Sequence, residues 1–286
     1  MQRDSVSDPQ SNNYKWFVLV ILTVVYAFNF IDRQILVILQ EPIKAELGLS
    51  DTQLGLLTGF SFAVVYVTAG IPIAWLADRS NRRNIVAVSL GIWSVMTALS
   101  GMVQNYTQLL LARLGVGLGE AGGSPPSHSM LSDYFPEEQR GTALSIYTTG
   151  IYLGIFFGYF AGGWIADTYG WRNAFFIVGI PGVVLAFLLL LLVREPLRTV
   201  LPNAVENEKA SFKETIVFLL QRPAFWWIAL GCSTASFVGY GNGNFFPSLL
   251  IRNYGLTVTE VGMFMGVISG STCLLYTSPS PRDRYG

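Results

Sequence analysis

The sequence predicts an all-α, polytopic membrane protein. Of its 286 residues, 51% are hydrophobic and only 13% are charged, and the mean hydropathy is +0.45. Soluble domains carry about 25% charged residues, so this composition favours a membrane protein. Long apolar runs recur along the chain, and a helix needs about 20 such residues to cross the hydrocarbon core of a bilayer. The net charge is zero and no basic tract is present, so we expect no nucleic-acid partner.

Eight apolar segments are candidates for spanning helices. In chain order they are Trp16–Leu39, Gln53–Ala77, Ile85–Gln104, Gln108–Leu131, Ala143–Ala166, Asn173–Val193, Ala224–Leu250 and a broken one, Glu260–Gly270. Residues 1–14 are polar and predict a cytoplasmic tail rather than a cleaved signal peptide. Residues 15–193 thus predict a six-helix bundle, and residues 224–272 predict the first one to two helices of a second bundle.

Lysine and arginine gather in the loops on one side of the predicted bundle. That side holds Arg3, Lys15, Arg79, Arg82, Arg83, Arg140, Arg194, Arg198, Lys209, Lys213 and Arg222. The opposite side holds only Lys44, Arg172 and Arg252. The positive-inside rule therefore predicts a cytoplasmic N-terminus and a multi-pass protein of the inner membrane. Residues 194–223 are polar, with prolines and mixed charge, and predict a cytoplasmic linker between the bundles.

An internal repeat divides the first six helices. The letters WLAD at 75–78 match WIAD at 164–167, and Arg83 matches Arg172 at the same offset. A repeat of three helices is odd in number, so successive copies enter the membrane from opposite sides. Two inverted three-helix repeats are typical of secondary transporters.

The segment AWLADRSNRR, residues 74–83, resembles a loop motif of the major facilitator superfamily, G-x-x-x-D-R-x-G-R-R, although Ala74 and Asn81 replace its two glycines. The strings NFIDRQ and RLGVGLGEA, in the first and fourth helices, are similar to the spinster-like branch and to bacterial permeases for sugar acids and aromatic acids. The resemblance covers residues 15 to 270. It implies a monomeric transporter without enzymatic activity or cofactor, whose partners are a small solute, protons and the lipid bilayer.

Four charged residues fall inside predicted spans: Asp32, Arg33, Arg113 and Glu120. Arg113 and Glu120 are two helical turns apart and share one face. A charge at the membrane centre costs about 2.5–3.5 kcal/mol, so these groups must be paired or hydrated. One interpretation is a pair of structural ion pairs, Asp32–Arg113 or Glu120–Arg33.

The other interpretation is a working site. Burial raises the pKa of a carboxyl, so a carboxylate in a cavity can load a proton near neutral pH. An arginine stays charged and binds carboxylates through two parallel hydrogen bonds. The resemblance assigns proton coupling to Asp32 and Glu120, and places Arg33 and Arg113 in the polar cavity as binding residues for an anionic substrate.

The loop cluster of Asp78, Arg79, Arg82 and Arg83 has two interpretations. By resemblance it is a gate that latches the two halves when the cytoplasmic side is closed. Positive-inside anchoring alone would explain the arginines, but it does not explain Asp78.

The string at 117–122 spells G-x-G-x-x-G, but it lacks the preceding strand and the later acidic residue of a dinucleotide site. We therefore interpret the glycines as helix-packing positions, because small residues every three or four positions let helices approach closely. These positions are Gly115, Gly119, Gly122, Gly154, Gly158 and Gly162.

The seventh segment contains GYGNGNFFP, in which Tyr240 and Asn242 predict a broken helix that lines the substrate cavity; a purely structural kink is the alternative. The string CLLYTSPSPRD at 273–283 is what a common transposon-type sequencing adapter encodes, so we expect residues 273–286 to be non-native. Four other functions stay open: a facilitated-diffusion uniporter, a lysolipid transporter, a membrane-bound oxidoreductase and a non-transporting receptor.

Overall fold

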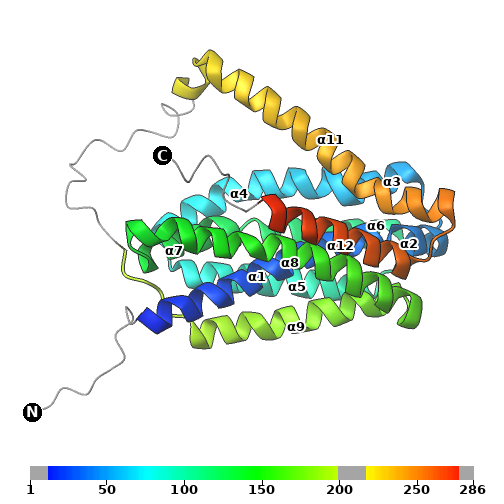
Figure 1. Ribbon diagram of the computed structural model, residues 1–286, viewed down its shortest axis with the longest axis horizontal. Coiled ribbons are helices and arrows are strands. Elements are labelled where there is room, and N and C mark those ends of the chain that lie inside the picture. Colours follow the sequence, from blue (N-terminus) through cyan, green and yellow to red (C-terminus); the bar gives the residue numbers. More distant parts are fainter. Residues whose placement is uncertain (1–11, 199–216, 277–286) are drawn as a thin grey trace, which may run out of the picture.

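The computed structural model describes residues 12–198 and 217–276, in which all regular elements are helices (Figure 1). They are α1 (Asn12–Ile38), α2 (Gln40–Leu47), α3 (Asp51–Gly55), the π-helix η1 (Leu56–Phe60), α4 (Ser61–Arg79), α5 (Arg82–Ser100), α6 (Tyr106–Glu120), α7 (Ser124–Tyr134), α8 (Glu137–Tyr169), α9 (Trp171–Leu192), α11 (Pro223–Tyr254) and α12 (Val258–Tyr276). Most of the predicted tail, the central part of the linker and residues 277–286 lie outside the described residues.

Five helical segments of the described chain are long and apolar enough to cross a membrane. They are Asn13–Ile38, Asp51–Arg79, Arg82–Ser100, Glu137–Tyr169 and Trp171–Leu192. The predicted fourth span is divided into α6 and α7, because α6 ends at Glu120 and prolines open the first turn of α7. The prediction of a broken eighth helix is wrong: α12 is continuous, because its glycines are tolerated where the helix packs on α8.

The helix ends follow local capping chemistry. The side chains of Asn81 and Asn105 accept hydrogen bonds from the third residue of α5 and of α6, at 2.9 and 3.0 Å. A single residue, Gly170, joins α8 to α9 with a φ of 85°, a conformation that glycine adopts without steric cost. α5 packs between α6 and α9.

Glycines set the closest helix contacts in the bundle. Gly150, Gly154, Gly158 and Gly162 of α8 all lie against α1, and a Cβ added at Gly150 would stand 2.6 Å from the Thr23 carbonyl oxygen. Gly115, Gly119 and Gly122 lie against Met96, Trp93 and Ser89 of α5. The two stripes predicted from the sequence therefore occupy two different helix interfaces, α8 with α1 and α6 with α5.

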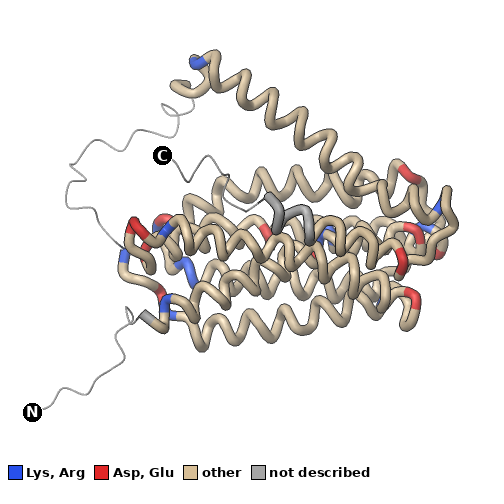
Figure 2. The backbone as a smooth tube through the Cα atoms, viewed as in Figure 1, with Lys and Arg blue, Asp and Glu red and all other residues tan. Residues whose placement is uncertain are grey.

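Charged residues gather at the two ends of the bundle, and few lie along its length (Figure 2). Large apolar side chains such as Phe60, Phe187 and Leu191 are 65–79% exposed along that length, where lipid would cover them. We call one end the Arg82 end and the other the Arg252 end, after an arginine at each.

The two last helices sit differently on the bundle. α12 packs along α8, whereas α11 touches the bundle at the Arg252 end and diverges from it toward its own N-terminus (Figure 1). The predicted break in the seventh helix is wrong, since α11 runs unbroken through Pro247. Its glycines at 239, 241 and 243 have no neighbour within 4 Å among the described residues, so nothing there strains the helix.

Candidate functional site

Four charged side chains converge inside the first bundle. Asp32 and Arg33 come from α1, and Arg113 and Glu120 come from one face of α6. Asp32, Arg113 and Glu120 are 0–2% exposed, whereas the side chain of Arg33 is 17% exposed. Charges buried this deeply are costly, so these four residues form the candidate functional site.

Arg33 is held by one carboxylate and three aromatic rings. Its Nε donates to Glu120 Oε2 at 2.7 Å. The centroids of the Phe30, Phe62 and Tyr66 rings lie 4.8–5.1 Å from the guanidinium carbon, which is the range of cation–π contacts. An arginine carries five N–H donors, so the contact through Nε leaves its two terminal nitrogens for another acceptor.

The ion pair expected between Asp32 and Arg113 is not formed. Arg113 Nη1 instead donates to the backbone carbonyl of Asp32, at 3.4 Å. In the part of the chain that the structure describes, Asp32 Oδ1, Glu120 Oε1 and Arg113 Nε have no hydrogen-bond partner. The pairing Glu120–Arg33 is therefore present, and the alternative pairing is not.

Tyr240 and Asn242 make no hydrogen bond to this cluster within the described ranges, although Tyr240 acts electrostatically on Arg33. Both lie in the diverging part of α11 and are exposed, Tyr240 to 60%. Their neighbour Asn244 does reach the first bundle, where its carbonyl oxygen accepts from Gln40 Nε2 at 2.7 Å.

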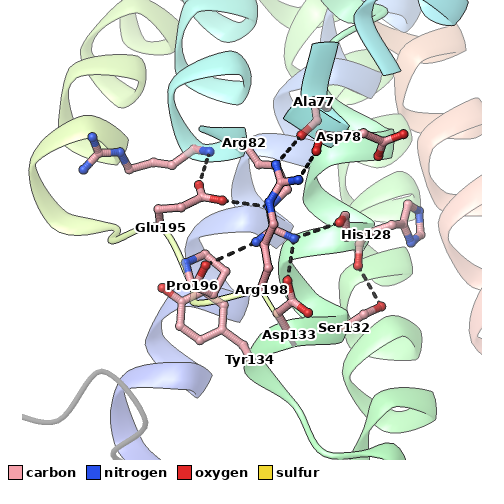
Figure 3. Close-up of polar contacts among 12 residues, drawn as sticks. Ala77, Asp78, Arg82, His128, Ser132, Asp133, Tyr134, Glu195, Pro196 and Arg198 are labelled. Atoms are coloured by element: carbon pink, nitrogen blue, oxygen red, sulfur yellow. Dashed lines mark hydrogen bonds and ion pairs between the residues drawn. The ribbon is translucent and has the colours of Figure 1, made fainter. Parts of the chain in front are cut away.

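A second polar cluster occupies the Arg82 end (Figure 3). Arg82 is 3% exposed and donates to Asp133 Oδ2 at 2.5 Å, to Glu195 Oε1 at 2.7 Å and to Ser129 Oγ at 2.8 Å. Glu195 also accepts from the backbone N–H of Arg83 at 2.8 Å. All of these groups belong to the first bundle or to the segment that follows it.

The other predicted gate residues have separate contacts. Arg79 stacks on Trp75, with its guanidinium carbon 4.0 Å from the ring centroid. Asp78 is exposed, and no ion pair links its carboxylate to an arginine among the described residues. Its backbone carbonyl accepts from Arg198, which also donates to the carbonyls of Ala77 and Ser80 at 2.8 Å. The acidic partners of this arginine cluster are thus Asp133 and Glu195, and not Asp78.

The sequence argument missed Asp133, Glu195 and Arg198. Residues 192–198, here the 192–198 segment, lie across the Arg82 end: Tyr14 and Tyr134 bond its backbone at 2.5–2.9 Å, as does Arg82 at 3.2 Å. The sequence offered a signal, because Asp133 and Glu195 are acidic residues just beyond the predicted fourth and sixth spans, on the side where the charge bias places Arg82. The described residues contain no group of three or more His, Cys, Asp or Glu that could hold a metal ion.

The helical fold and the charges buried inside it define a polytopic transporter-like membrane protein. The chain matches the Major Facilitator Superfamily over residues 22–286. It therefore belongs to that superfamily, whose members are transporters, in its spinster-like and sugar-acid permease branch.

Three similar proteins show how much of the chain is matched and at what sequence identity. The chain is 37% identical to an "MFS-type efflux pump" of Mycolicibacterium smegmatis over 91% of this chain and 60% of the relative. It is 30% identical to the "Probable galactarate/D-glucarate transporter GudP" of Bacillus subtilis, over 72% of this chain and 46% of the relative. A crystal structure of a bacterial homolog to the human lysosomal transporter Spinster, inward-facing and unoccupied, matches with a TM-score of 0.84 and 36% identity, over 92% of this chain and 61% of that one. The chain thus spans about 60% or less of the length of these proteins.

Proposed function

We propose that this chain is the first bundle and part of the second bundle of a proton-coupled secondary transporter for a small organic anion. The transporter lies in the cytoplasmic membrane, and the Arg82 end faces the cytoplasm. The observation that carries this proposal is Arg33, which Glu120 and three aromatic rings fix in place while its side chain stays partly exposed.

Arg33 suits a carboxylate better than Arg113 does. Two parallel N–H groups on the outer edge of a guanidinium match the two oxygens of a carboxylate. Arg113 is 2% exposed and turned toward the Asp32 backbone, so its role is to support the site from inside. We therefore assign anion binding to Arg33 and a supporting electrostatic role to Arg113.

Coupling follows from the competition between Glu120 and the substrate for Arg33. A charged Glu120 neutralises Arg33, and a protonated Glu120 leaves the guanidinium charge for the incoming anion. Binding of the anion and of the proton then favour each other, which is the coupling that symport requires. Asp32, buried beside Glu120, is the second proton-binding group.

The orientation is supported by the excess of Lys and Arg at the Arg82 end and by the likeness to an inward-facing structure. In that orientation α11 diverges on the cytoplasmic side, and the Arg252 end is the closed outer side. The site would then be reached from the cytoplasm.

The test is uptake of radiolabelled D-glucarate and galactarate into proteoliposomes that contain the complete protein, with and without a pH gradient. Glu120→Gln should abolish accumulation against a gradient while exchange between loaded compartments persists. Arg33→Lys should raise the KM by about tenfold or more, because the bidentate contact is lost. Glu137→Gln is the matched control, since it makes the same change at an exposed position of α8.

If Glu120→Gln accumulates substrate with an unchanged pH profile, the coupling assignment is wrong. If accumulation is independent of the pH gradient in the unmodified protein, it is a uniporter or uses another ion.

A second candidate is proton-driven export, favoured by the identity to the "MFS-type efflux pump", which exceeds that to the sugar-acid transporter. The same variants in inside-out vesicles decide the direction. Net movement against an opposing proton gradient would assign export, and net movement with it would assign uptake.

A further inference from the structure

Thr97 of α5 has a buried hydroxyl that its own helix does not use. Several hydroxyls in the described helices donate to the carbonyl four residues earlier, as Thr23 does to Leu19 at 2.8 Å and Thr148 to Leu144 at 2.7 Å, whereas Thr97, Ser94 and Ser248 do not. Such a bond is the ordinary arrangement where no water is at hand. Thr97 is 0% exposed, yet its Oγ1 has no hydrogen-bond partner among the described residues.

The Thr97 hydroxyl lies beside the carboxyl of Asp32. Asp32 is 1% exposed, and its Oδ1 also has no partner in the described chain. The charged groups that face Asp32 are Glu120 and Arg113 on α6 and Arg33 on α1. Arg113 contacts the Asp32 backbone and Arg33 pairs with Glu120, so neither arginine forms an ion pair with the Asp32 carboxyl.

We propose that Thr97 is a positioning residue that holds the Asp32 carboxyl in both its charged and its protonated form. A hydroxyl has one donor and two acceptor sites, so it donates to a carboxylate and accepts from a carboxylic acid. Rotation of the hydroxyl hydrogen about the Cβ–Oγ1 bond exchanges the donating arrangement for the accepting one, without movement of either helix. A buried hydroxyl without a hydrogen-bond partner destabilises the fold. Valine has nearly the same shape and would avoid this cost if the hydroxyl had no role. The inference rests on the proposed role of Asp32 as a proton-binding group.

The test uses the proton alone as probe, on the complete protein in lipid nanodiscs. Infrared difference spectra after a pH jump report the carboxyl C=O stretch, and the band of Asp32 is identified by its loss in Asp32→Asn. Thr97→Val removes the hydroxyl at nearly constant shape, and Thr97→Ser keeps it. Thr23→Val is the matched control, because that hydroxyl is buried but bonded to its own helix.

Thr97→Val should change the frequency of the Asp32 band and displace its titration midpoint by about one pH unit, as the loss of a hydrogen bond to a charged group does. Thr97→Ser should restore both values, and Thr23→Val should leave both unchanged. If Thr97→Val does not fold, Thr97→Ala removes the same hydroxyl with less crowding.

An Asp32 band with unchanged frequency and midpoint in Thr97→Val would overturn this inference while the proposed function stands. If Asp32→Asn removes no carboxyl band, the proposed proton role of Asp32 is wrong, and this inference is wrong with it.

Discussion

The two ends of the molecule hold charged residues in different ways. At the Arg82 end, the described partners of Arg82 all lie in the first bundle or in the 192–198 segment. At the Arg252 end, contacts cross between the two bundles: Arg252 of α11 pairs with Glu41 and Asp51 at 2.7 and 2.6 Å. One end is therefore fastened within a bundle, and the other is fastened between bundles.

The close packing of α8 on α12 is a second contact between the two bundles. A Cβ added at Gly163 would stand 2.6 Å from the Val258 carbonyl oxygen, and Thr259 donates to Asp167 through its backbone and its hydroxyl at 2.8 and 2.7 Å. These contacts would break if the bundles separated at the Arg252 end, whereas those of Arg82 would not. We therefore predict that substitutions at the Arg252 end change the distance between the bundles, and that substitutions in the Arg82 cluster change the stability of the first bundle.

The largest effect is expected from Arg82→Ala. It leaves the carboxylates of Asp133 and Glu195 without their shared cation at a site that is largely buried, which costs about 3 kcal/mol in similar cases. We expect a lower melting temperature of the complete protein in detergent, and faster hydrogen exchange in the 192–198 segment. Arg79→Ala, which removes an exposed arginine stacked on Trp75, should cost less than about 1 kcal/mol. Equal melting temperatures for the two variants would show that the Arg82 cluster is not a rigid fastening.

Gly163→Leu should open the Arg252 end without loss of the fold. Overpacking costs about 1–3 kcal/mol, which displaces a two-state equilibrium by about five- to 150-fold. The measurement is the spin-label distance between cysteines at Thr168 on α8 and Tyr254 on α11, two exposed positions beside the contact. The populated distance should increase.

The control for this change is Gly239→Leu, at a position on α11 with no neighbour within 4 Å. Its distance distribution should match that of the unmodified protein. If Gly163→Leu leaves the distribution in place, the contact between α8 and α12 does not hold the end closed.

Asp167→Ala should have a smaller effect in the same direction. It removes the acceptor for a backbone N–H in the first turn of α12, and such caps contribute about 1 kcal/mol. A roughly fivefold increase in the open population is expected from the same spin labels. Asp78→Ala changes the repeat-related aspartate at the Arg82 end, whose carboxylate has no ion pair in the described structure, and should change the distribution less. A larger effect for Asp78→Ala than for Asp167→Ala would show that the Arg82 end, and not the Arg252 end, sets the distance between the bundles.

The smallest effect concerns Glu46 on α2. Hydrogen bonds from Arg172 and from Trp171 lower the pKa of Glu46. A lowered pKa in the folded state stabilises at pH values above the unfolded pKa of about 4.3, and this contribution is lost as the pH falls through the folded pKa. The free energy of unfolding should therefore differ between Glu46→Gln and the unmodified protein by a constant amount from about pH 5 to 8. A difference that changes across that range would make Glu46 a pH sensor.

The sequence determined the membrane class, the helix order and the two glycine stripes, because apolar length and small-residue spacing act through neighbours on the same helix. It also predicted the burial of Asp32, Arg113 and Glu120, since they lie inside apolar runs, but not that of Arg82. Only the tertiary structure decided that Arg33 pairs with Glu120 while Arg113 contacts the Asp32 backbone, and that Arg82 is bonded to Asp133 and Glu195 instead of Asp78. The physical reason is that ion pairs join residues that are distant in sequence, and their choice depends on helix rotation and depth, which a single sequence does not fix.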